Sequence, residues 1–146
     1  MEAARAHKTY KQVHVETASQ GKLIIMLYDT AIKRTEEAIK LLGSKKLDEV
    51  NNNLIRAQDI IAELRASLDM KTGEIAANLD RLYDYILRLL VGGNVRKQKS
   101  PLEEAVKLMT ALRDTWKELF DNLPVSEIPP TRQDAARSNA MLNVRG

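Results

Sequence analysis

Cysteine is absent from this 146-residue sequence, and residues that interrupt helices are scarce. Without cysteine the chain forms no disulfide framework, binds no metal through thiolates and has no cysteine nucleophile. A reducing compartment is therefore permitted, and we expect a soluble protein in the cytoplasm. Only 4 prolines are present, and three of them lie beyond residue 123, so most of the chain is free to form helices.

Signals for targeting and for membrane insertion are also missing. The first residues lack the apolar run of a signal peptide, and no stretch approaches the ~20 apolar residues that a membrane-spanning helix needs. We therefore expect neither secretion through a signal peptide nor stable insertion in a membrane.

Motifs that carry catalysis are lacking as well. The sequence contains no P-loop, no G-x-G-x-x-G after a strand and no G-x-S-x-G elbow. The two histidines, His7 and His14, lie near the N-terminus, and no inward Glu-x-x-His motif of a di-iron bundle occurs. Pairs of acidic residues such as Asp80 and Asp84 have nearby arginines and indicate a surface charge lattice. We expect a protein that is not an enzyme, with no cofactor and no metal.

The net charge is only +3, and its clearest local excess is a run of three cations, Arg96, Lys97 and Lys99. Nucleic-acid-binding surfaces usually combine clustered cations with stacking aromatic residues. The run predicted here is a short basic loop without aromatics, which indicates a solvated linker. We expect no nucleic-acid binding.

Four segments show helical periodicity, and no segment alternates apolar and polar residues as a half-buried strand does. We predict an all-α, antiparallel four-helix bundle. The first helix is predicted from about Ser19 to Leu42, with Gly43 as a left-handed cap. The third is predicted to stop at Gly92-Gly93, and the fourth to run from an N-cap at Ser100 to about residue 123. Core positions on the second helix are predicted at Leu47, Val50, Leu54, Ala57, Ile61, Leu64 and Leu68.

The remaining segments flank this bundle. Residues 1–18 are predicted to form an N-terminal strap or short helix, residues 19–123 the bundle, and residues 124–146 a disordered C-terminal tail. Met141, Leu142 and Val144 are the only apolar cluster of that tail, either incidental or a weak anchor onto the bundle.

Apolar residues exceed what four packed stripes need. The first helix has an unbroken apolar run over residues 23–28, and a helix that is apolar all round must be covered all round. Covering even ~400 Å2 of apolar surface would be worth roughly 10 kcal/mol before ordering costs. A patch of that size usually marks an interaction site. The predicted flanking residues are Ile24, Ile25, Tyr28, Ile55, Ile60, Tyr83 and Tyr85, and we predict that Trp116 belongs to the core.

Several stretches resemble one family in the same order and spacing. They are YKQV at 10–13, ETAS at 16–19, KLIIMLYDTAI at 22–32, NLIRAQDIIAEL at 53–64, LYDYI at 82–86 and LRDTWK at 112–117. Together they resemble the FliS family of flagellar export chaperones over about residues 10–120. The resemblance implies a cytoplasmic helical bundle that binds the C-terminal disordered segment of flagellin, prevents premature polymerisation and assists type III export. It also implies that an N-terminal strap covers part of the binding surface when flagellin is absent, and contacts with the export gate or other flagellar proteins remain open.

These arguments give a hypothesis for the binding site. We expect hydrophobic grooves that bind flagellin as helices, with Tyr10 acting as a latch in the free protein. The predicted partner-binding residues are Tyr10, Val13, Ile24, Tyr28, Ile55, Gln58, Ile60, Tyr83 and Tyr85.

Two other functions remain open at this stage. The apolar surplus also suits a structural helical module that self-associates, so the free chain is expected to be a monomer or a homodimer. The cations Arg96, Lys97 and Lys99 would suit an RNA-associated regulator, for which salt-dependent RNA binding would be the sign.

Overall fold

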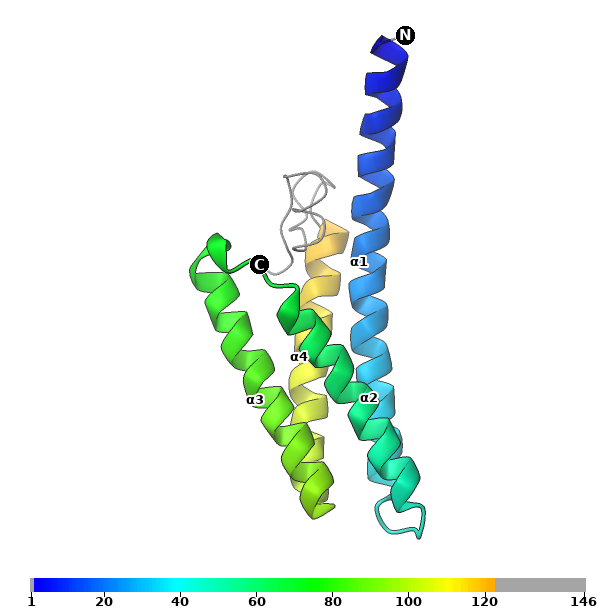
Figure 1. The fold of residues 1–146 in the computed structure, drawn as a ribbon, viewed down its shortest axis with the longest axis vertical. Coiled ribbons are helices and arrows are strands. Elements are labelled where there is room, and N and C mark those ends of the chain that lie inside the picture. The colour runs from blue at the N-terminus through cyan, green and yellow to red at the C-terminus, as the bar shows by residue number, and fades with distance from the viewer. Residues whose placement is uncertain (1, 123–146) are drawn as a thin grey trace.

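The computed structural model describes residues 2–122, with side chains placed from residue 20 onwards. These residues form α1 (Glu2–Leu41), α2 (Leu47–Ala66), the 3-10 helix η1 (Met70–Thr72), α3 (Glu74–Arg96) and α4 (Lys99–Asn122). α1 packs against α2 and α4, and α3 packs against the same two helices, so the four α-helices close a ring (Figure 1). The predicted all-α four-helix bundle is confirmed.

α1 is longer than predicted. It runs without interruption from Glu2, so the predicted start near Ser19 is wrong. Residues 2–19 contain neither proline nor glycine, and nothing in that stretch ends a helix. The first part of α1 extends past the ends of the other helices (Figure 1). Because a continuous helix crosses residue 18, the division into strap and bundle stays a prediction, and the predicted disordered tail lies outside the described residues.

The core follows the predicted stripes closely. Trp116 is only 5% exposed, which confirms it as a core residue. Of the seven core positions predicted for the second helix, six are buried, five on α2 and Leu68 just beyond it, whereas Leu47 is 47% exposed and was predicted wrongly. Ile75, in the first turn of α3, is also exposed. The largest fully buried side chains are Tyr28, Tyr83, Leu54, Ile60, Ile61, Leu68, Ile86, Leu90, Leu102, Met109 and Val50.

The end of α3 differs from the prediction. The helix passes through Gly92 and Gly93 and ends at Arg96, so the predicted stop at the two glycines is wrong. Gly93 has a packing role instead: an added Cβ would lie 2.4 Å from the Leu102 side chain on α4. The turn is made by Lys97, whose φ of 52° is left-handed. The predicted left-handed residue Gly43 does not adopt such an angle, while Gly73 does.

The connection from α3 to α4 is therefore shorter than the basic loop predicted from the sequence. Arg96 belongs to the last turn of α3 and Lys99 is the first residue of α4, which leaves only two residues between the helices. Ser100 lies inside α4 and is not its N-cap. A cation at the C-terminal end of a helix interacts favourably with the helix dipole, so Arg96 stabilises the last turn of α3.

Candidate partner-binding site

Two of the nine predicted partner-binding residues lie on the first part of α1. The backbone at Tyr10 and Val13 is helical, but their side chains lie outside the described residues. Their roles, including the latch proposed for Tyr10, stay predictions.

Four other predicted residues lie in the core. Ile24 and Tyr28 on α1, Ile60 on α2 and Tyr83 on α3 are each no more than 2% exposed. The hydroxyl groups of Tyr28 and Tyr83 are hydrogen-bonded at 2.5 Å across the centre of the bundle. The expectation that these four flank the core at the surface is wrong, because the bundle itself covers them. Their use as partner contacts stays a prediction.

Polar contacts join α2 and α3 near both ends of their packing. Asn94 donates its side-chain amide to the Asn51 Oδ1 atom at 2.9 Å. At the other end Arg65 donates from Nε to Asp80 Oδ1 at 2.8 Å and from Nη1 to Asp84 Oδ1 at 3.1 Å. The two contacts share one antiparallel register, which brings Ile55 of α2 opposite Val91 of α3.

Between these contacts the side chains are apolar and incompletely covered. Ile55 is 43% exposed and Val91 is 45% exposed, while Gln58 and Leu87 are half-buried. Residues three and four apart share one face of a helix, so these positions continue along the same sides of α2 and α3. We call the resulting surface the α2–α3 face. It consists of Ile55, Gln58, Leu87 and Val91 between the contacts, together with Leu47 and Val95, which lie just beyond the Asn51–Asn94 contact.

Sequence reasoning found Ile55 and Gln58 of this face and missed its α3 half. Leu87, Val91 and Val95 recur at four-residue steps, which is a helical signal that was available in the sequence. It was overlooked because Gly92-Gly93 was predicted to end the helix, which left Val95 in a loop. Val95 is 78% exposed in the structure.

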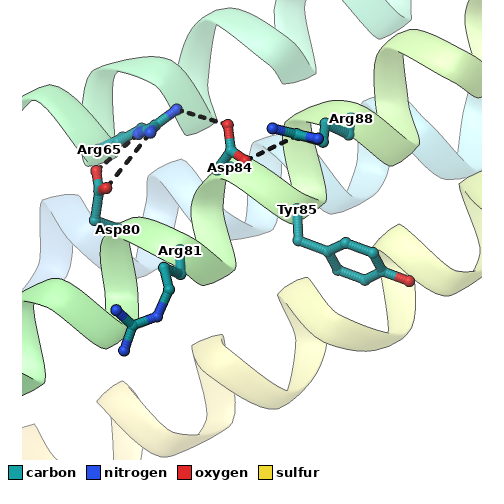
Figure 2. Close-up of a pocket in the computed structure, with 6 residues that line it drawn as sticks. All are labelled: Arg65, Asp80, Arg81, Asp84, Tyr85 and Arg88. Atoms are coloured by element: carbon teal, nitrogen blue, oxygen red, sulfur yellow. Dashed lines mark hydrogen bonds and ion pairs between the residues drawn. The ribbon is translucent and has the colours of Figure 1, made fainter.

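A hollow of about 360 Å3 lies on α3 next to the α2–α3 face. Figure 2 shows Arg65 pointing across from α2 to Asp80 and Asp84, and Arg88 approaching Asp84 from the next turn. The hydrogen bond from Arg65 is the main cause that lowers the pKa of Asp80, and the same bond raises the pKa of Arg65. The predicted surface charge lattice is therefore present, with an added cross-helix arginine.

Tyr85 also lines this hollow but points toward α4 (Figure 2). Its hydroxyl donates a hydrogen bond to the carboxylate of Glu104, which together with desolvation raises the pKa of Tyr85. The ring is 44% exposed. The structure thus brings Ile55 and Gln58 together on one face and places Tyr85 on the other side of α3.

The arrangement suits recognition of a polypeptide. An exposed apolar stripe between two helices can take the apolar side of an incoming helix, and the charged groups at its end can fix orientation. None of the described helices is long and apolar enough to cross a membrane.

Comparison with known proteins gives a consistent result. A profile of the family described as "Flagellar protein FliS" matches residues 3–123. The flagellar secretion chaperone FliS of Bacillus subtilis is 34% identical over 116 residues, which cover 80% of this chain and 86% of the relative. The flagellar secretion chaperone FliS of Salmonella typhimurium is 37% identical over 125 residues, which cover 82% of this chain and 93% of the relative. FliSB of Pseudomonas aeruginosa, also a flagellar secretion chaperone, is 33% identical over 121 residues, which cover 80% of this chain and 96% of the relative.

The family profile extends over nearly all of the described residues and ends one residue beyond α4. The matches agree with the resemblance carried by the sequence stretches and with the four-helix architecture. The chain belongs to the FliS family, a family of flagellar secretion chaperones and not of enzymes.

Proposed function

We propose that this protein is a cytoplasmic chaperone that binds the C-terminal segment of flagellin, prevents its premature polymerisation and assists its type III export. Membership of the FliS family supports the role. The observation that carries the binding step is the α2–α3 face, where Ile55 and Val91 stay almost half exposed between two helices that are otherwise joined.

The α2–α3 face suits a client that must later leave. Covering roughly 300 Å2 of apolar surface is worth about 7 kcal/mol before ordering costs. Ordering a disordered client consumes several kcal/mol of that gain, so the complex is held and remains releasable. A flagellin subunit that polymerises buries its own apolar side against other subunits. A chaperone face that covers this apolar side first therefore prevents polymerisation.

The proposal depends on the exposed residues and not on the buried ones. Contacts with Tyr28 or Tyr83 would require the core to open and the 2.5 Å hydrogen bond between them to break. Ile55 and Gln58 need no such change, since neither is fully buried. The first binding contacts are therefore assigned to the α2–α3 face.

Calorimetric titration of a C-terminal flagellin segment into the full chain tests the proposal. Ile55→Asp introduces a carboxylate into the apolar contact and is expected to weaken binding by at least about tenfold, since hot-spot substitutions cost more than about 1–2 kcal/mol. Helicity in circular dichroism should stay near wild type because Ile55 lies at the surface.

Met26→Asp is the matched control. It adds the same charge in place of a 62% exposed apolar residue of α1, which packs on α2 and α4, and binding should be unchanged. Absence of flagellin binding, together with a homodimer in light scattering, would favour the self-associating module. Equal weakening by both variants would show that the α2–α3 face is not the contact.

A further inference from the structure

The outer side of α3 presents two arginines with unused hydrogen-bond donors. Arg88 uses its Nε atom to donate to Asp84 at 2.9 Å, and its side chain is 78% exposed. Arg81 is exposed and donates from Nη2 to the neutral side chain of Asn78. A guanidinium carries five N–H donors, so within the described residues both groups keep donors for a further acceptor.

The carboxylates beside them are already neutralised. Arg65 bonds to both Asp80 and Asp84, and the bond to Arg65 is the chief cause of the lowered pKa of Asp80. The hollow is lined by three arginines and two aspartates. Arg65 and Arg88 together balance the two aspartates, so the cationic excess lies with Arg81, while Arg88 keeps its Nη donors for a further acceptor.

The spacing of these groups matches a polypeptide and not a small ion. Arg81 and Arg88 are seven residues apart, which on a helix is two turns, or about 10 Å along the axis. The half-exposed ring of Tyr85 lies between them in sequence and lines the same hollow (Figure 2). Val91 continues the same helix onto the apolar α2–α3 face.

We propose that the partner segment bound at the α2–α3 face is an acidic amphipathic one, whose carboxylates pair with Arg81 and Arg88 while its apolar side chains cover Ile55 and Val91. The proposal rests on the proposed function and specifies the chemistry of the client at that site. For a helical segment, the two carboxylates lie about two turns apart. The paired charges fix the register and direction of the segment, which an apolar stripe alone does not.

Charge argues against the chain's own C-terminal segment as the occupant. Beyond Asn122 the sequence has three arginines, Arg132, Arg137 and Arg145, and only two acidic residues. That segment therefore has no excess of carboxylates to pair with Arg81 and Arg88. A protein segment with an excess of carboxylates is the complementary partner.

The test is a double-mutant cycle on affinity measured by calorimetry with the full chain. One probe is a C-terminal flagellin segment, and the other is the same segment with every Asp and Glu replaced by Asn and Gln. Against the wild-type chain the neutralised segment should bind roughly three- to tenfold more weakly, as expected for the loss of two exposed ion pairs. Against Arg81→Gln/Arg88→Gln the two segments should bind equally, and the wild-type difference should shrink at high salt.

Arg56→Gln/Arg96→Gln removes the same charge from exposed arginines away from the hollow and should leave the difference intact. If neutralising the segment weakens binding equally for wild type and Arg81→Gln/Arg88→Gln, the pairing is wrong although the chaperone function stands. If the segment binds the wild-type chain not at all, the function and the pairing both fail. A change of oligomeric state in the arginine variant, without a change in segment affinity, would assign the arginines to contacts between copies and overturn the proposal.

Discussion

The α1–α4 contact and the α2–α3 contact are built from the same kind of antiparallel helix pair, yet only the first is closed. On the α1–α4 side Gly21 lets the Phe120 ring approach to 3.3 Å of the place a Cβ would take. Phe120 stacks on Trp116 with ring centroids 5.7 Å apart, and Arg113 bonds to Asp29 at 2.9 Å outside them. Aromatic rings fill that contact out to its polar edge.

The α2–α3 contact has its polar bonds near the ends, and Ile55, Gln58, Leu87 and Val91 lie between them without an aromatic ring. No aromatic side chain is part of this face, and Ile55 and Val91 each remain almost half exposed. Side-chain volume thus decides which helix pair is sealed and which is available to a partner. Substitutions at a buried and at an exposed position of the same helix test this difference.

The largest effect is expected from neighbouring residues of α2. Leu54 is fully buried and Ile55 is 43% exposed. Leu54→Ala should lower the free energy of unfolding by about 2–5 kcal/mol, because it removes buried methyl groups and leaves a cavity. Ile55→Ala should cost less than about 1 kcal/mol, as most surface substitutions do. Urea unfolding followed by circular dichroism measures both through the midpoint at constant slope.

Flagellin affinity should show the opposite order, with Ile55→Ala weakening binding more than Leu54→Ala. Equal stability costs for the two variants would mean that Ile55 is as well covered as Leu54. The α2–α3 face would then be closed, and the comparison with the α1–α4 contact would lose its basis.

A second, smaller contrast lies at the two glycines of α3. Gly93→Ala would bring a Cβ within 2.4 Å of the fully buried Leu102, so overpacking should cost about 1–3 kcal/mol. Gly92 has nothing within 4 Å of an added Cβ. Gly92→Ala should therefore stabilise the helix by up to about 1 kcal/mol through helix propensity. Thermal unfolding of both variants measures the contrast, and a shift of the same sign in each would contradict the close packing of α3 on α4.

These glycines also show how far the sequence alone could lead. Periodicity was sufficient for the four helices and for most of their core, because stripes at three- and four-residue steps are local signals. It was not sufficient for Gly93, whose role depends on Leu102 of another helix. A Gly-Gly pair in isolation favours a break, and only the tertiary contact explains why the helix continues.

The candidate site was predictable only in part for a related reason. Ile55 was found because it lies outside the main stripe of α2, but the same reasoning selected Ile60, which is fully buried. Tyr28 and Tyr83 were assigned to the surface because tyrosine often flanks a core, but their hydroxyl groups satisfy one another across the bundle. A cross-bundle pair separated by 55 residues leaves no local pattern in the sequence.

The smallest effect concerns the ion pairs at the charged end of the α2–α3 face. Asp80→Asn should cost less than about 1 kcal/mol at neutral pH, since Arg65 and Asp80 are both about one-third exposed. The pKa of Asp80 is lower in the folded chain than in the unfolded one, so its contribution to stability is present above the unfolded value of about 3.9. That contribution is lost as pH falls from about 3.9 through the lowered folded pKa, because the unfolded chain then binds more protons.

The stability difference between wild type and Asp80→Asn, measured by urea unfolding from pH 7 to pH 2, should therefore vanish at the acid end. Asp59→Asn removes an exposed carboxylate of α2 with no ion pair in the described part of the chain, and as the control it should cost less than Asp80→Asn at pH 7. A difference for Asp80→Asn that stays constant with pH would show that Arg65 does not hold this carboxylate, and the ion-paired end of the α2–α3 face would no longer contrast with Arg81 beside it.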